Sequence, residues 1–198
     1  MIAPLTLAER LASSRLMEAH KAIVATLAPL FPGVQVVRHP GRVDVADLVE
    51  KEIFSAPTIA VAATRVRVAR ELAGEHGLAV EWTAYLIVED KVVGNRRVER
   101  DEIAHALGAG LLAVLEDHEA PRWGLEDITD PADEPRPELR PVFTVKALER
   151  GVALFAVIWT QTLLSLGEAL WDFTSPPPPD FDPRVYLPGD PPPPEDAP

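Results

Sequence analysis

Two short clusters of arginines are the side chains in this sequence whose spacing suggests that they act together. Arg65 and Arg67 stand two residues apart in an apolar stretch, whereas Arg96 and Arg97 come shortly before a helical pattern. Residues two apart in a strand point to the same face, so Arg65 and Arg67 are expected to project together. Guanidinium groups pair well with carboxylates. The clusters therefore predict either ion pairs within the chain or a basic rim that meets an acidic surface on an identical neighbour.

The residue types that catalysis needs lack the spacing that catalysis requires. The sequence has no glycine-rich phosphate loop, its histidines do not follow a zinc-binding pattern, and its serines lack a nucleophile-elbow context. It contains no cysteine, which excludes disulfides, thiolate metal sites and cysteine nucleophiles. The carboxylates between Glu126 and Glu134 could hold a divalent cation, but a charged loop is more often only solvated. We therefore expect no catalytic residue, no metal, no cofactor, and a protein that is not an enzyme.

Composition narrows the class of protein further. The chain of 198 residues is 47% apolar, which is enough for a normal core, and its formal net charge is −12. Such acidity argues against general binding to nucleic-acid phosphates, for which a basic surface is expected. The stretch MIAPLTLAER has neither a basic start nor an unbroken apolar run, so we expect no secretory signal there.

The most apolar run, from Gly151 to Gly167, indicates the element around which the fold is built. Its side chains are apolar at both odd and even positions, as in a strand that is covered on both faces. We predict a long buried strand to about Gln161 at the centre of the fold. A buried helix is the main alternative, because leucines follow from Leu163 onward. A membrane helix would need about 20 apolar residues, and polar residues from Thr160 onward interrupt the run.

The N-terminal part predicts one long helix. Thr6 and Glu9 have the spacing of a capping box, in which each side chain bonds to an exposed amide of the other residue. An apolar stripe with alternating spacings of four and three residues then runs from Leu16 to Leu30, with His20 as a core-edge histidine. The pair Pro32-Gly33 ends the helix.

Strands and a short helix are predicted after this first helix. Val34 to His39 reads as a short strand, and Val45 to Phe54 as a short helix. Two long strands follow, from Thr58 to Ala69 and from Leu78 to Glu89. Because the connection between them is short, an antiparallel pair is the simplest arrangement.

A second long helix is predicted from Glu99 to Asp117. Gly108 and Gly110 lie inside it, although each costs about 1 kcal/mol relative to alanine there, so we expect close approach to a packed neighbour. Residues 118–141 are polar and proline-rich and predict a long loop, with a strand at Trp123 to Ile128.

Together these elements predict an α+β domain, with an antiparallel or mixed sheet and the two long helices packed on one face. A short helix from Thr144 to Arg150, stopped by Gly151, would lead into the last strand. We assign residues 1–174 to this single domain. Residues 175–198 hold 11 of the 21 prolines and predict an extended polyproline or disordered tail. That tail is either a solvated linker or an arm that docks on a neighbouring subunit.

With these elements in place, the chain resembles the small tail terminator proteins of long-tailed bacteriophages, especially the Mu-like contractile group. The resemblance rests on the N-terminal helix leading to a short strand, and on the paired long strands followed by ERDEIAHALGAGLLAVL. It rests also on the closing phrase KALERGVALFAVIWTQT, with Trp159 and Gln161. The similarity covers roughly residues 5 to 165, so the polyproline tail lies outside it.

The resemblance implies a structural virion protein. Proteins of this family form a six-membered ring at the head-proximal end of the tail tube, which stops tube growth and joins the tail to the neck. The implied partners are identical copies, the tail tube protein, and sheath and neck or connector proteins. DNA would pass through an acidic lumen without specific binding. The implied location is the tail–neck region of the virion, after assembly in the host cytoplasm, with no membrane contact.

Two alternatives stay open at this point. One is a head-to-tail connector or neck protein of similar fold, and the other is an enzyme or small-ligand-binding α+β domain. For the ring, we expect the loop 118–141 and the strand-edge arginines to make contacts. The predicted subunit or partner contacts are Arg65, Arg67, Arg96, Arg97, Trp123, Phe181 and Tyr186.

Overall fold

The computed structural model describes residues 6–41, 57–70, 76–117, 120–143, 149 and 151–164. Within these ranges the elements follow the order predicted from the sequence, with additions at both ends of the second long helix. They are α1 (Leu7–Ala12), α2 (Arg15–Leu30), β1 (Gln35–His39), β2 (Thr58–Arg70), β3 (His76–Glu89), β4 (Lys91–Val93), β5 (Arg96–Val98), α4 (Arg100–Glu116), the 3-10 turn η1 (Ala120–Arg122), β6 (Glu138–Pro141) and β7 (Val152–Leu163).

The main sheet has the strand order β1-β2-β3-β7-β6 and is mixed. β1 runs parallel to β2, whereas β2–β3, β3–β7 and β6–β7 are antiparallel. β4 and β5 form a separate two-stranded ribbon. The predicted α+β class and the antiparallel pairing of the two long strands are confirmed. The middle strand is β3, however, and β7 lies beside it rather than at the centre.

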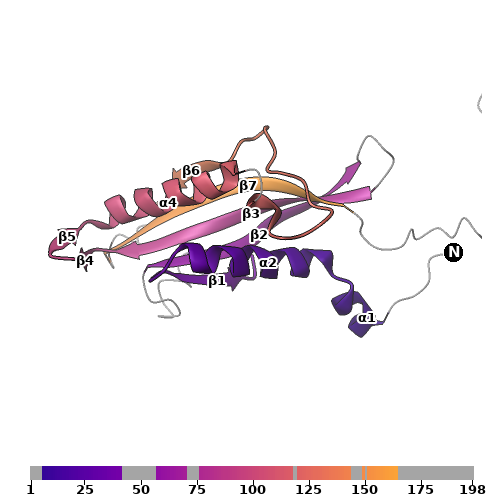
Figure 1. The fold of residues 1–198 in the computed structure, drawn as a ribbon, viewed down its shortest axis with the longest axis horizontal. Helices are drawn as coiled ribbons and strands as arrows, with labels where there is room; N and C mark the ends of the chain where they lie inside the picture. Colours follow the sequence, from indigo (N-terminus) through magenta and orange to yellow (C-terminus); the bar gives the residue numbers. More distant parts are fainter. Residues whose placement is uncertain are drawn as a thin grey trace, which may run out of the picture.

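Both long helices pack on the same face of the main sheet, as predicted (Figure 1). α2 lies over β1 and β2, and α4 lies over β3 and β7. Burying a leucine or isoleucine side chain contributes about 1.5–3 kcal/mol, so this layer is the main source of stability. Its largest fully buried side chains include Ile23, Leu27, Trp82, Leu86, Leu111 and Trp159.

The opposite face of the sheet is also buried. Leu154 and Ala156 of β7 join Tyr85 and Ile87 of β3 in a second apolar cluster. The alternate residues of β7, such as Val157, belong to the cluster under the helices. The prediction that β7 is a strand covered on both faces is therefore confirmed, and the helical alternatives for this run are wrong.

The predicted single N-terminal helix is wrong, because the chain breaks between α1 and α2. The capping box at Thr6 and Glu9 is present and starts α1. Ser13 then ends that helix, and the Oγ of Ser14 accepts a hydrogen bond from the backbone N–H of Met17 at 3.4 Å. Serine is a strong N-cap residue, so the second serine starts a new helix where the apolar stripe begins.

The close approach predicted at the glycines of α4 is confirmed. An added Cβ at Gly108 would meet the side chain of Leu139 on β6, and one at Gly110 would meet the ring of Phe31 at 3.1 Å. Only glycine lets α4 lie this close to both neighbours at once.

The long loop is described from residue 120 onward, and the strand predicted at Trp123 to Ile128 is wrong. Trp123 and Asp127 have φ values of 55° and 57°, in the left-handed region that an extended strand excludes. The loop instead runs beside β7, where the backbone N–H groups of Thr129 and Ala132 donate to carbonyls of that strand. The strand of this segment is β6, which continues along the same edge of β7.

Several predictions fall outside the described residues. These are the helix from Val45 to Phe54, the tail 175–198 and the boundary at residue 174. Of the predicted helix from Thr144 to Arg150 only Glu149 is described, and it is helical. Gly151 has φ +74°, as expected for a left-handed stop.

Candidate functional site

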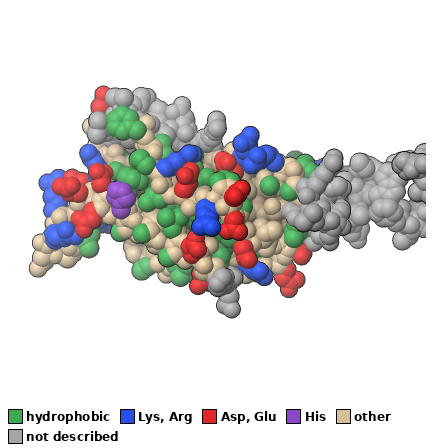
Figure 2. Space-filling model, turned by 90° about the horizontal axis from the view of Figure 1, so that it is seen from above, with side chains coloured by type: hydrophobic (Ala, Val, Ile, Leu, Met, Phe, Trp, Pro, Cys, Tyr) green, Lys and Arg blue, Asp and Glu red, His purple; other side chains and the backbone are tan. Residues whose placement is uncertain are grey.

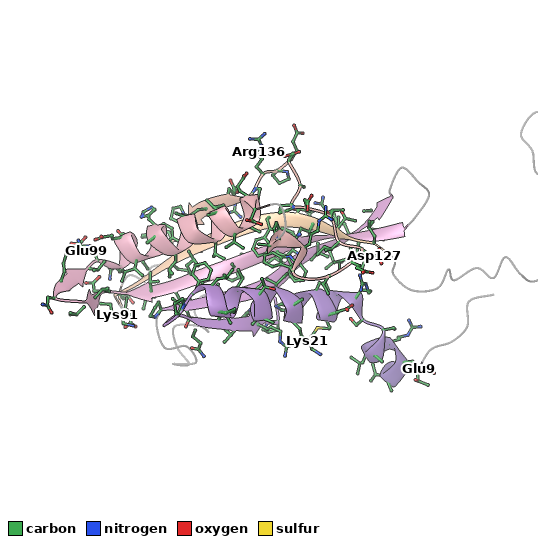
Figure 3. All side chains as sticks on the ribbon, viewed as in Figure 1. Glu9, Lys21, Lys91, Glu99, Asp127 and Arg136 are labelled. Carbon is green, nitrogen blue, oxygen red and sulfur yellow. The ribbon has the colours of Figure 1, made fainter. Side chains whose placement is uncertain are left out.

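The β4–β5 ribbon forms one end of the elongated molecule and carries two of the predicted contact arginines. Figure 3 marks this end with Lys91 and Glu99. The turn contains Gly94, with φ +61°, followed by Asn95. Such a Gly-Asn pair between two short strands is a recognised hairpin signal, so this ribbon could have been predicted from the sequence.

Asp90 fixes the ribbon to the start of α4. Its Oδ2 accepts a hydrogen bond from Nη2 of Arg97 at 2.7 Å, and its Oδ1 accepts one from the backbone N–H of Arg100 at 3.0 Å. The bond from Arg97, and then that from Arg100, lower the pKa of the Asp90 carboxyl. On the other side of the ribbon, Arg96 pairs with Glu102.

Arg96 and Arg97 therefore make ion pairs within the chain, which was the simpler of their two predicted roles. Their side chains nevertheless stay 67% and 75% exposed. Exposed ion pairs contribute little to stability, because water and salt screen them. Both guanidinium groups can still meet a partner, so the contact role remains a prediction.

The same ribbon also exposes apolar side chains. Val92 is 67% exposed and Val93 is 58% exposed. Adjacent strand residues point to opposite faces, so each side of the ribbon exposes one valine beside one arginine of the paired strand. Figure 2 shows charged side chains of both signs gathered at this end. Apolar side chains with a charged rim have the composition of a protein–protein contact.

The other end of the molecule carries the second arginine pair. β1 pairs with β2 only as far as Ala62, so from Ala63 to Arg70 the outer edge of β2 has no strand partner among the described residues. Arg65 and Arg67 project together from this segment, as predicted, and both are exposed. No described carboxylate forms an ion pair with either one.

The opposite face of this segment is apolar. Val66 and Val68 are 42% and 73% exposed, and they pair across the ribbon with Val80 and Leu78. Val80 belongs to the core under the helices. The apolar face of the sheet thus continues along the β2–β3 ribbon beyond the N-terminal end of α2 (Figure 1).

α1 adds a further apolar surface at this end. It projects away from the sheet (Figure 1), with Leu7 and Leu11 on one helix face and 73% and 64% exposed. An open groove between α1 and α2 is lined by Leu11 and Met17 among others. Its apolar lining and exposure suit a helix or loop of another protein better than a small ligand.

Trp123, predicted as a contact residue, lies in the chain's own core and is 4% exposed. Its Nε1 and that of Trp159 both donate to Oε1 of Gln161 at 2.9 Å. The Nε2 of Gln161 donates to the carbonyls of Pro121 at 2.8 Å and Thr129 at 2.9 Å. This buried amide is fully hydrogen-bonded and holds the loop on β7. The side chain of Trp123 therefore supports the fold and offers no contact surface.

Two of the predicted contact residues come from the C-terminal segment 175–198. Phe181 and Tyr186 lie outside the described residues. Across the part of the chain that the structure describes, no group of three or more His, Cys, Asp or Glu side chains is placed to hold a metal ion. The same part contains no helix that is long and apolar enough to cross a membrane.

The sequence matches no protein-family model, and no curated protein is significantly similar to it.

Proposed function

We propose that this protein is a subunit of a homo-oligomeric ring at the head-proximal end of a phage tail tube, where it stops tube growth and joins the tail to the neck. One observation carries the proposal. The elongated body has two separate surfaces at opposite ends, the β4–β5 ribbon and the β2–β3 ribbon with α1, and each exposes apolar side chains beside arginines (Figure 1).

Two different surfaces at opposite ends suit a head-to-tail contact. In such a contact, the first surface of one subunit binds the second surface of the next subunit. The chain of subunits closes into a ring when a whole number of these rotations completes a full turn. A two-fold dimer would instead use one self-complementary surface. The exposed apolar pairs Val92–Val93 and Leu7–Leu11 supply what such contacts bury.

Charge supports the same function. A formal net charge of −12 on each copy would make a ring strongly negative overall, which disfavours binding of the DNA that passes through it. The partners in this proposal are identical copies, the tail tube protein, and sheath and neck proteins, and the protein is located at the tail–neck region of the virion.

A tube-growth assay tests the proposal. Purified tail tube protein is polymerised from a short tube seed with and without this chain, and tube lengths are measured by electron microscopy. A terminator caps the growing end, so tubes stay at the length of the seed when the chain is present. Tubes that keep growing at an excess of the chain would contradict the proposal.

A further inference from the structure

The open edge of β2 is the strongest unexplained surface of the molecule. Eight residues, Ala63 to Arg70, form a strand edge that no described strand covers. Its exposed side chains alternate between basic and apolar, with Arg65 and Arg67 on one face and Val66 and Val68 on the other. An open strand edge can accept an added strand through its backbone N–H and C=O groups.

One segment of this chain has the complementary pattern. Residues 180–187 read DFDPRVYL and lie between two prolines, Pro179 and Pro188. In an extended conformation, the residues that share one face are Phe181, Pro183, Val185 and Leu187. The other face holds Asp180, Asp182, Arg184 and Tyr186.

We propose that residues 180–187 of one subunit add as a strand to the open edge of β2 on the neighbouring subunit of the ring. This inference rests on the proposed ring and names one of its contacts. Asp180 and Asp182 then face Arg65 and Arg67, while the apolar face of the added strand covers Val66 and Val68. Strand addition supplies affinity through backbone hydrogen bonds, and the alternating side chains set the register.

Charge and proline placement agree with this arrangement. The tail 175–198 has five carboxylate side chains and one arginine, so its formal net charge is −4, opposite in sign to the edge it meets. Pro183 has no N–H to donate, and proline is accepted in an edge strand when that position faces solvent. The backbone N–H groups of Asp182 and Arg184 then point toward β2.

The length of the connection allows the strand to reach a neighbour. The described chain ends at Leu164, just after Leu163 pairs with Leu78, which itself pairs with Val68. β7 is thus two strand spacings, about 10 Å, from the open edge of its own subunit. Fifteen residues lie between Leu164 and Asp180, and this connection can span about 50 Å. A connection of this length is therefore long enough to reach the open edge of another copy.

Charge reversal on each side tests the contact. One full-length variant carries Arg65→Glu with Arg67→Glu, and a second carries Asp180→Lys with Asp182→Lys. We expect each variant alone to associate less, with a mass closer to one chain in sedimentation at low ionic strength. Mixing the two restores association, because each tail then meets an edge of opposite charge. A control variant with Arg38→Glu, at an exposed position on β1 outside the proposed contact surfaces, should associate like the unmodified chain.

Mixing also distinguishes docking on a neighbour from docking on the same chain. If only a single chain with all four substitutions regains association, and mixing has no effect, the segment docks on its own subunit and the proposal is overturned. The absence of cysteine adds a direct check, since cysteines introduced at Val66 and Phe181, which lie opposite each other in this register, would be the only thiols present in the two chains. A disulfide between the two chains supports docking on a neighbour.

A peptide experiment separates this inference from the ring itself. A labelled peptide of residues 175–198 is titrated into the Asp180→Lys, Asp182→Lys variant, and binding is followed by fluorescence anisotropy. We expect binding that weakens at least tenfold when Arg65→Glu and Arg67→Glu are added. Binding without rings would support the contact and refute the ring. Rings that neither charge reversal disturbs, together with no peptide binding, would overturn the contact and leave the ring standing.

Discussion

Gly108 on α4 lies directly against Leu139 on β6. A Cβ added at Gly108 would come within 2.5 Å of Cδ2 and 2.7 Å of Cδ1 of Leu139, closer than real Cβ contacts. The pair sets how near α4 lies to the edge of the sheet, and through it the position of the β4–β5 ribbon at the start of α4.

This contact predicts that the effect of Gly108→Ala on the free energy of unfolding changes sign when Leu139 is shortened. Gly108→Ala should lower the free energy of unfolding by about 1 kcal/mol or more, because Leu139 must leave its position. In a Leu139→Ala background the same substitution should raise it by about 1 kcal/mol, since alanine is the better helix former. Urea unfolding of the four proteins of this double-mutant cycle measures both effects. Destabilisation of equal size in both backgrounds would show that Leu139 is not the obstacle.

The buried amide of Gln161 predicts a large loss of stability. Gln161→Leu leaves two indole N–H groups and two backbone carbonyls without their partner. Each unsatisfied buried group costs about 1–3 kcal/mol, so we expect unfolding to become easier by at least about 3 kcal/mol. Thr160→Val is the matched control on the same strand and should change stability by less than about 0.5 kcal/mol. Equal urea midpoints for the two variants would contradict this role.

His20 predicts a dependence of stability on pH. It is 7% exposed, and its Nε2 lies 2.7 Å from the carbonyl oxygen of Val61, where it donates. Burial lowers the pKa of His20 from 6.5 in spite of this bond. The unfolded chain therefore binds a proton more readily than the folded one as the pH falls below 6.5.

The contribution of His20 is thus fully present above that pH and is lost as the pH falls from 6.5 toward the lowered pKa of the folded state. Thermal unfolding between pH 7.5 and 5 should show this decline in the unmodified chain and a shallower one in His20→Gln. His105→Gln, at an exposed position on α4, serves as the control and should keep the full slope. An unchanged slope in His20→Gln would contradict the assignment.

The β4–β5 ribbon predicts loss of assembly without loss of folding. Val92→Lys with Val93→Lys replaces two exposed side chains, so the free energy of unfolding should stay within about 0.5 kcal/mol of that of the unmodified chain. Association of subunits should weaken strongly, because charges would be buried in the contact. Leu30→Lys, at a 50% exposed position on α2, is the control for added charge. Equal association of the unmodified chain, the double valine variant and the Leu30→Lys control would show that the ribbon is not part of the subunit contact.

The sequence predicts the elements that regular spacing encodes. β7 is apolar at every position from Val152 to Ile158, and a strand is the simplest element that buries both alternating sets. The glycines of α4 are costly in a helix, and both mark close contacts. Such patterns depend on neighbours along the chain and need no knowledge of distant residues.

Two kinds of feature could not be predicted from the sequence. In one, a local pattern fits two structures equally well, and in the other, a residue is buried by a partner far along the chain. The break at Ser13 and Ser14 interrupts a pattern that one straight helix explains equally well, and only the N-cap preference of serine indicates it. The burial of Trp123 depends on Gln161, 38 residues further along the chain. No local pattern shows that a tryptophan in a polar loop meets a buried glutamine on the last strand.

The most direct measurement of the central claim is the mass of the purified chain by light scattering, combined with negative-stain imaging with and without tail tubes. The proposed terminator predicts rings with six times the mass of one chain, or a plug at one end only of each tube. A chain that stays monomeric and leaves both tube ends bare would contradict the proposal.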